Sequence, residues 1–208
     1  GSEKAYVILG GDLISGANYV SLRTENNQDL VDQFLTVSDN LSRWLSALSP
    51  LFTEVHVYLT PGNHGRMTPN KKDCVSHENF DNLVLPYLEA RLQNYANVYC
   101  HRNEVEQSIA MFSVRGNSVF AAHGDRDPVE KIVDNMTKLF RVKPDICFVG
   151  HRHYNRVDTY YDTKVIQSGC LSGTDSYAID LRLRNKPEQT ITVVDASGVD
   201  CVYNVVFD

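Results

Sequence analysis

The sequence predicts an α/β fold, because short apolar runs alternate with longer stretches in which apolar residues recur at helical spacing. Hydrophobic residues make up 42% of the chain and charged residues 22%, which excludes a disordered or collagen-like protein. No apolar run approaches the roughly 20 residues that span a bilayer, so no membrane association is expected. At 208 residues the chain has the length of a single domain, and we expect one domain over residues 1–208.

The first half of the chain predicts two strands and two helices. Residues 5–9 form a continuous apolar run, and residues 54–60 alternate apolar and polar side chains, so both are expected to be strands. Residues 28–49 and 80–95 carry apolar residues three and four apart, which is typical of amphipathic helices. Trp44 lies on the apolar stripe of the first helix and is therefore expected in the core.

The pattern after residue 108 begins with a hairpin. Residues 109–115 and 118–122 are strand-like and flank Gly116-Asn117, a favourable two-residue turn. Residues 128–141 are expected to form a helix, and residues 145–149 a further buried strand.

The remaining segments are expected to be loops and strands. Residues 13–28 and 65–79 have the character of long loops, which in a compact domain are often functional. The last fifty residues are predicted to be mostly strands, with turns at Asp162-Thr163 and at Ala196-Ser197-Gly198.

The net charge and the spacing of the cysteines argue against two kinds of binding site, a broad nucleic-acid surface and a thiolate zinc site. Twenty basic and 26 acidic residues give a net charge of −6, which argues against a broad basic surface for nucleic acid but allows a local basic patch. The five cysteines are odd in number and none has CxxC spacing, so a thiolate zinc site is not expected. Cys147 and Cys170 have apolar neighbours, and buried free thiols in a reducing cytoplasm are the simplest interpretation.

Four apolar runs are each followed directly by residues that can bind a metal ion. In open α/β sheets ligands bind beyond the carboxyl ends of the strands, where these side chains would meet. Each could also be an ordinary turn or strand-end residue, but the repetition favours a shared site. The residues are Asp12, Asn63 and His64, His123, and His151 with His153.

These residue types suit a particular kind of ion. Carboxylate, amide oxygen and imidazole together favour zinc, manganese or iron. His151 and His153 are two residues apart, so in an extended segment they would point to the same side and could serve two neighbouring ions. A pair of ions about 3.5–4 Å apart is suited to phosphoester hydrolysis.

The ordered motifs GGDLISG (10–16), PGNH (61–64), AHGD (122–125) and VGHRH (149–153) resemble those of the calcineurin-like metallophosphoesterase superfamily. GNHGR in place of GNHD or GNHE resembles a phage and bacterial branch described as DNA-repair phosphoesterases. The resemblance implies a two-sheet sandwich flanked by helices.

The resemblance also implies a role for each residue. Asp12 would bridge two metal ions, and His64 would stabilise the transition state and protonate the leaving oxygen as the catalytic residue. Asn63, His123 and His151 would complete the second metal site, and His153 would bind the first. Arg66 either contacts a substrate phosphate or is a solvated loop arginine.

Two departures from the motif set are visible in the sequence. The superfamily's opening Asp-x-His does not occur before Asp12, and Gly1-Ser2 resembles a cloning scar, so the chain is expected to be N-terminally truncated and to lack its first strand. One metal site would then be incomplete, hydrolysis weak or absent, and an exposed sheet edge open to self-association. The second departure is Gly65, which stands where a carboxylate commonly follows the histidine.

The expected function is hydrolysis of a phosphodiester, including nucleic acid, by a metal-bound hydroxide. A small-molecule phosphatase or nucleotide phosphodiesterase, and an inactive scaffold that keeps the fold for binding, stay open as alternatives. Phosphodiesters are preferred by analogy with the nuclease-like members of the branch. The protein is expected to be cytoplasmic.

Overall fold

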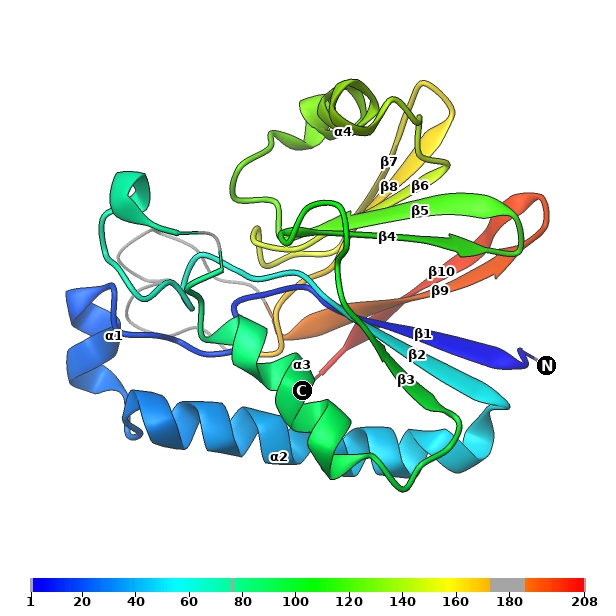
Figure 1. Cartoon of the computed structure of the whole chain (residues 1–208). Helices are drawn as coiled ribbons and strands as arrows, with labels where there is room; N and C mark the ends of the chain where they lie inside the picture. Colours follow the sequence, from blue (N-terminus) through cyan, green and yellow to red (C-terminus); the bar gives the residue numbers. More distant parts are fainter. Residues whose placement is uncertain (1, 76, 173–185, 208) are drawn as a thin grey trace. The chain divides into compact units, whose positions relative to one another are not determined.

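The computed structural model describes residues 2–75, 77–172 and 186–207 (Figure 1). Its chain groups into two compact units, residues 1–110 and residues 111–208. Several sheets are flanked by helices, which confirms the expected α/β class. No helix among the described residues is both long and apolar enough to cross a membrane.

The first unit is built on a parallel sheet of three strands in the order β1-β2-β3. These are β1 (Lys4–Leu9), β2 (Glu54–Leu59) and β3 (Val98–His101). The first two were expected, whereas β3 was not predicted. Its four residues are too few to show a clear periodicity.

Helices connect these strands and cover one face of the sheet (Figure 1). The two principal helices, α2 (Leu30–Leu48) and α3 (Asp81–Arg91), confirm the predicted ones. A short helix, α1 (Val20–Glu25), lies in the segment expected to be a long loop. Single 3₁₀ turns occur at η1 (Ser49–Leu51) and η2 (Lys71–Asp73).

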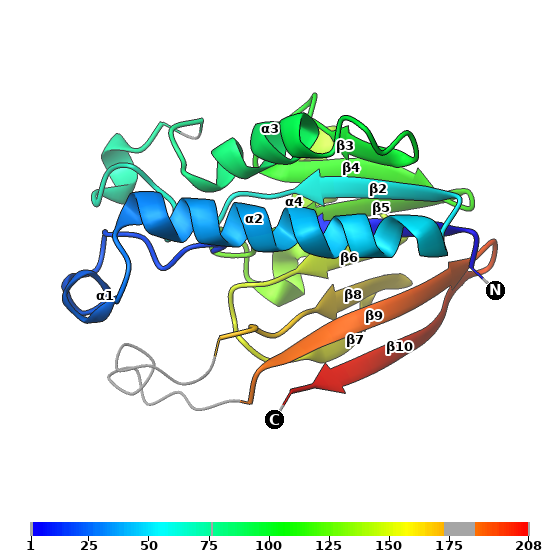
Figure 2. The ribbon, with the colours of Figure 1, turned by 90° about the horizontal axis from the view of Figure 1, so that it is seen from below.

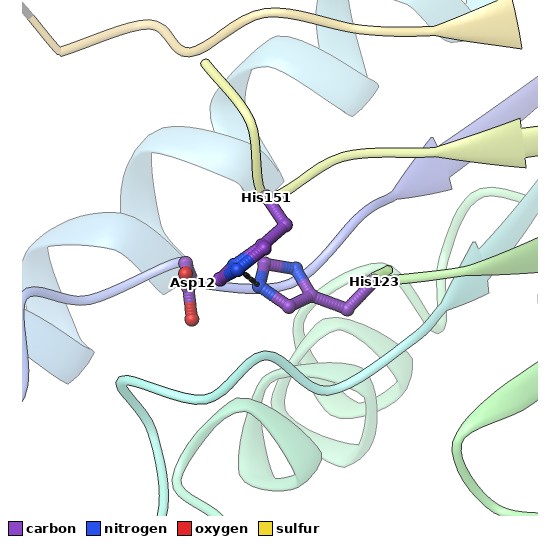
Figure 3. Close-up of side chains that lie close together, drawn as sticks. All are labelled: Asp12, His123 and His151. Carbon is purple, nitrogen blue, oxygen red and sulfur yellow. Dashed lines mark hydrogen bonds between the residues drawn. The ribbon is translucent and has the colours of Figure 1, made fainter. Parts of the chain in front are cut away.

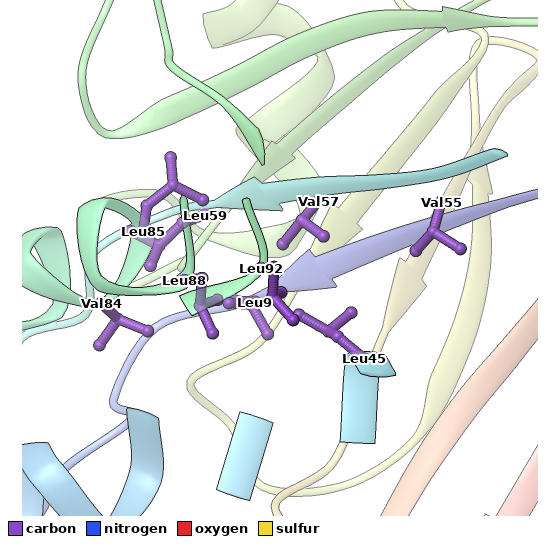
Figure 4. Packing of buried hydrophobic residues seen from close by; sticks show 9 residues of the cluster. All are labelled: Leu9, Leu45, Val55, Val57, Leu59, Val84, Leu85, Leu88 and Leu92. Carbon is purple, nitrogen blue, oxygen red and sulfur yellow. The ribbon is translucent and has the colours of Figure 1, made fainter. Parts of the chain in front are cut away.

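The core of this unit lies between the sheet and the two principal helices. Leu45 of α2 and Leu88 of α3 are fully buried against Val55 and Val57 of β2 (Figure 4). The other buried members of the cluster are Leu9, Leu59, Val84, Leu85 and Leu92. This packing fixes the carboxyl ends of β1 and β2, from which the candidate site residues follow.

The placement of Trp44 in the core was wrong. Its side chain is 48% exposed, while the buried line along α2 passes through Ser38, Ser42 and Leu45. These residues are four and three positions apart, so they share one face of the helix. Trp44 is one residue from Leu45, which turns its side chain about 100° away from that face.

The second unit contains a sheet of five strands in the order β4-β5-β6-β8-β7. Its strands are β4 (Ile109–Val114), β5 (Asn117–Ala122), β6 (Ile146–Val149), β7 (Arg156–Tyr160) and β8 (Thr163–Gln167). β6 is parallel to both β5 and β8, so the carboxyl ends of β5 and β6 face the same way.

The remaining elements of this unit are one helical segment and a ribbon. The predicted helix is present as the turn η3 (Val129–Lys131) followed by α4 (Ile132–Phe140). Phe140 packs edge-on against Phe120 of β5, which joins α4 to the sheet. An antiparallel ribbon follows, made of β9 (Glu188–Asp195) and β10 (Gly198–Val206) (Figure 2). Residues 173–185, part of the region expected to be mostly strands, lie outside the described residues.

Two turns occur one residue earlier than predicted. Arg115 and Gly116 form the turn of the first hairpin, and Tyr161 and Asp162 that of a later one; all four have positive φ. Two consecutive positive φ angles match the hairpin turn whose twist suits the flanking strands. Asn117 and Thr163, predicted as turn residues, instead begin strands, and their buried side chains donate to the carbonyls of Val114 and Pro144 respectively.

The free thiols expected from the sequence are confirmed, since all five cysteines are unpaired. Cys147 is buried in β6, and burial raises its pKa to about 12. Cys170 is only half-buried, so its expected burial was wrong. The apolar neighbours of Cys170 in the sequence do not continue into a strand that would carry it inside.

Polar and aromatic side chains gather on the face of the three-stranded sheet opposite its core. His56 Nδ1 lies 2.8 Å from His101 Nε2, and His56 Nε2 lies 2.9 Å from the Glu54 carboxylate, which also pairs with Lys4. Tyrosine rings stack on these two histidines: Tyr6, Tyr58 and Tyr99. Burial lowers the pKa of His101, and the neighbouring His56 lowers it further.

This lowered pKa predicts that stability depends on pH. A histidine whose pKa is depressed on folding stabilises the native state above its unfolded pKa of about 6.5, and the contribution is lost as the pH falls through the lower native value. We expect the urea midpoint to fall between pH 7.5 and pH 5.5, and to fall less in His101→Asn. His77→Asn, at an exposed position of the same unit, should keep the wild-type dependence. An unchanged dependence in His101→Asn would contradict the assignment.

Candidate metal and phosphoester site

The candidate site residues of the first unit lie in the two segments that follow β1 and β2. Asp12 comes directly after Gly11, and both residues have positive φ, 52° and 86°. This bend turns the Asp12 carboxylate toward the segment after β2, where its Oδ1 accepts the backbone N–H of His64 at 2.8 Å. The structure thus brings together two residues that are 52 positions apart.

Close contact between the two segments depends on small residues. A Cβ on Gly62 would lie 2.1 Å from Asp12 Oδ1 and 2.2 Å from Asp12 N, and a Cβ on Gly16 would lie 2.1 Å from the His64 carbonyl oxygen. Neither distance is possible for a real side chain. Gly16 and Gly62 therefore let the two backbones approach each other.

His64 is held in a defined orientation. Its Nδ1 lies 3.0 Å from the Ser15 carbonyl oxygen, which can only accept a hydrogen bond, so Nδ1 carries a proton. Its Nε2 lies 3.9 Å from Asp12 Oδ2. In the neutral ring Nε2 is therefore the basic nitrogen, and it is the atom that can take up or donate a proton.

Tyr19 contacts both Asn63 and His64, although the sequence gave no reason to single it out. The Tyr19 hydroxyl accepts a hydrogen bond from Asn63 Nδ2 at 3.2 Å, and its ring centroid lies 4.9 Å from that of His64. Asn63 is buried. The contact with Tyr19 fixes the orientation of the Asn63 amide, whose oxygen is the kind of atom that binds cations.

Arg66 lies in the same loop as Asn63 and His64. Its Nε donates to the Asn63 carbonyl oxygen at 2.9 Å, and the Asn18 side chain donates to the Arg66 carbonyl oxygen. Its Nη1 is buried and has no hydrogen-bond partner among the described residues. The guanidinium is thus fixed beside Asn63 rather than extended into solvent.

A second residue that the sequence analysis did not select is Asp81, the first residue of α3. It is fully buried, and its carboxylate accepts backbone N–H groups of Asp12, Leu13 and Gly62. No motif marks this position, because it lies 17 residues after His64 within an ordinary helix start. An acidic residue in the first turn of a helix is common, so the sequence carries no signal that sets Asp81 apart.

In the second unit the structure pairs two of the three candidate histidines. His123 follows β5 and is 3% exposed, and His151 follows β6 with a φ of 68°. His151 Nδ1 lies 3.2 Å from His123 Nε2 (Figure 3). The Gly150 N–H donates to the His123 carbonyl oxygen, which joins the two strand ends directly.

The spacing of these nitrogens fits two ligands of one metal ion. Imidazole ligands about 2.0–2.1 Å from a tetrahedral ion have nitrogens separated by roughly 3.3 Å. Two imidazole donors suit a borderline cation such as zinc, manganese or iron. His153, with a φ of 59°, lies two residues beyond His151, and its role as a ligand stays a prediction.

Polar residues thus follow the ends of strands in α/β units, as in proteins that bind a ligand at the carboxyl edge of a sheet. The sequence model of the calcineurin-like phosphoesterases matches residues 1–155, about three quarters of the chain. The protein belongs to this family, whose members typically bind divalent metal ions. A search of curated proteins found no match.

Solved structures with similar chains are distant. A protein of Thermotoga maritima is 12% identical, with a TM-score of 0.48 and coverage of 98% of this chain and 99% of that one. An archaeal phosphodiesterase is 15% identical, with a TM-score of 0.49 and coverage of 98% and 83%. Vps29 of Entamoeba histolytica, solved with zinc, is 14% identical, with a TM-score of 0.42 and coverage of 80% and 88%.

The glycine packing predicts a sharp contrast between two alanine substitutions. Gly62→Ala should lower stability and Mn²⁺ affinity, because its Cβ would collide with Asp12, whereas Gly10→Ala meets no atom within 4 Å. We expect the thermal midpoint of Gly62→Ala to fall by several degrees, about the effect of 1–2 kcal/mol, and that of Gly10→Ala to stay near wild type. Equal behaviour of the two variants in calorimetry and metal titration would refute the proposed packing.

Proposed function

We propose that the protein is a metal-dependent phosphodiesterase, with nucleic acid or a nucleotide-sized diester as its substrate class. Membership of the calcineurin-like phosphoesterase family supports hydrolysis of a phosphoester. The observation that carries the proposal is the fixed orientation of His64, with Nδ1 directed at the Ser15 carbonyl and Nε2 toward Asp12. A histidine that only filled space would not need this alignment.

The metal ligands in this proposal are Asp12, Asn63, His123 and His151, with His153 serving a second ion. Manganese, zinc and iron all suit this donor set. A bound divalent ion supplies Lewis-acid polarisation of the phosphate and lowers the pKa of water. The Tyr19 hydroxyl accepts a hydrogen bond from Asn63 Nδ2, which fixes the orientation of the amide whose oxygen would bind the cation.

His64 acts as the proton donor to the leaving oxygen. The Ser15 carbonyl holds the proton on Nδ1, so the transferable proton is the one on Nε2. His64 therefore serves as a general acid whose orientation is fixed by the segment that follows β1.

Arg66 contacts the substrate phosphate. Its Nε is held by Asn63, and its buried Nη1 has no protein partner in the described part of the chain, so a bound anion can satisfy it. The net charge of −6 argues against a broad surface that binds long nucleic acid. A nucleotide-sized diester is therefore the alternative to a polymeric substrate.

Substitution of the site residues tests the proposal. With Mn²⁺ present, His64→Ala should lower kcat on a chromogenic phosphodiester at least 100-fold, the usual effect of removing a general acid, while Mn²⁺ affinity changes little. Asn63→Ala should lower Mn²⁺ affinity itself. Assays against a phosphomonoester and single-stranded DNA identify the substrate class, and His77→Ala, at an exposed histidine of the same unit, is the matched control.

Three outcomes would contradict parts of this assignment. Wild-type rates in both His64→Ala and Asn63→Ala would reject the site. Turnover of the monoester alone would replace the diesterase by a phosphatase. Mn²⁺ binding without turnover of any substrate would favour a scaffold that keeps the fold for binding.

The role of Arg66 has its own test. Arg66→Ala should raise KM for the diester about tenfold or more, because a charged hydrogen bond to the phosphate is lost, and leave kcat less affected. Arg66→Lys keeps the charge but not the two-pronged geometry and should give an intermediate KM. Steady-state kinetics in which KM is unchanged in both variants would show that Arg66 does not contact the substrate.

A further inference from the structure

The buried carboxylate of Asp81 joins the two segments that carry the candidate site of the first unit. Oδ2 accepts the N–H of Asp12 at 3.0 Å and of Gly62 at 2.8 Å, and Oδ1 accepts the N–H of Leu13 at 3.2 Å. A fully buried carboxylate is costly unless such donors satisfy it, so the two segments and Asp81 stabilise one another.

Asn79 holds the carbonyl side of Gly62, so that Asn79 and Asp81 together form a clamp on the backbone of this residue. Its Nδ2 donates to the Gly62 carbonyl oxygen at 2.7 Å, and its Oδ1 accepts the N–H of Asp81 at 2.9 Å. Both polar groups of the Gly62 backbone are thus held from the start of α3. Gly62 is the residue directly before Asn63, so the clamp acts immediately next to the proposed ligand.

Gly65 provides the room for this arrangement. A Cβ on residue 65 would lie 2.2 Å from Asn79 Oδ1 and 3.1 Å from Asp81 Cγ. The space in which a side chain at position 65 would begin is therefore occupied by Asn79 and Asp81. A side chain at position 65 would therefore displace Asn79 and Asp81 from the places where they bind the Gly62 backbone.

We propose that Asp81 is a positioning residue that joins the two segments through their backbone amides and keeps Asp12 and Asn63 in ligand geometry. It acts through the backbone amides and does not touch the substrate. Asp12 can keep its left-handed backbone, and its bond to the His64 N–H, only while its own N–H is held. The effect on metal binding rests on the proposed function, whereas the joining of the segments does not.

Asp81→Asn tests this role with two independent readouts. Amide hydrogen exchange measured by NMR should be faster at Asp12, Leu13 and Gly62, by about tenfold or more, the equivalent of one lost hydrogen bond to a charged group. Mn²⁺ affinity, measured by calorimetry, should fall by a similar factor. In the diester assay kcat should fall more than KM rises, because the substitution misplaces metal ligands and leaves Arg66 intact.

Asp145→Asn is the matched control. Asp145 also accepts a backbone N–H, that of Ser118 at 2.7 Å, but it directly precedes β6 and so lies at the strand end opposite the one that leads to His151. This variant should keep wild-type exchange at Asp12, Leu13 and Gly62 and wild-type Mn²⁺ affinity. If Asp81→Asn does not fold, Asn79→Ser is the second variant. It keeps the Asp81 carboxylate but weakens the contacts that Asn79 makes with Asp81 and Gly62. It should show the same changes in exchange and Mn²⁺ affinity, but smaller ones.

The outcomes separate the two proposals. Unchanged exchange at the three amides would overturn the role of Asp81, and faster exchange with unchanged Mn²⁺ affinity would reduce it to a structural one. A wild-type protein that takes up no Mn²⁺ would contradict the proposed function, and the exchange rates would still show whether Asp81 joins the segments.

Discussion

The first half of the candidate site depends on one constraint: two backbone segments must touch where β1 and β2 end. Glycines make the approach sterically possible, and the Asp81 carboxylate makes it favourable by accepting amides from both segments. The hydrophobic core beneath β1 and β2 carries α3 to the position from which Asp81 reaches them. The geometry of the two segments is thus supported by the start of a helix that lies outside the motifs.

The elements predicted from the sequence were those with enough residues to show a period. β1, β2, α2 and α3 were expected within a few residues of their ends, because each carries a clear apolar pattern. β3 and α1 were not expected, since four and six residues are too short for one. Hairpin turns were misplaced by one position because backbone twist, rather than residue preference, selects the two residues with positive φ.

The same distinction applies to the candidate site: residues that follow an apolar run could be predicted, and residues that act through distant contacts could not. Asp12, Asn63, His64, His123 and His151 could be proposed from sequence because each directly follows an apolar run, and the structure pairs His123 with His151 and Asp12 with His64. Tyr19 and Asp81 could not, because their importance comes from contacts with residues 19 to 69 positions away along the chain. Such contacts leave no local pattern, so only the folded backbone shows which tyrosine and which carboxylate support the ligands.

The central proposal is that His123 and His151, which follow β5 and β6, bind one cation together through the two nitrogens that lie 3.2 Å apart. X-ray absorption spectroscopy of the protein loaded with one equivalent of Zn²⁺ tests it most directly. The proposal predicts two imidazole nitrogens at about 2.0–2.1 Å, completed by oxygen donors, with one imidazole lost in His123→Ala and one lost in His151→Ala. An all-oxygen shell, or a spectrum unchanged by either substitution, would contradict the account.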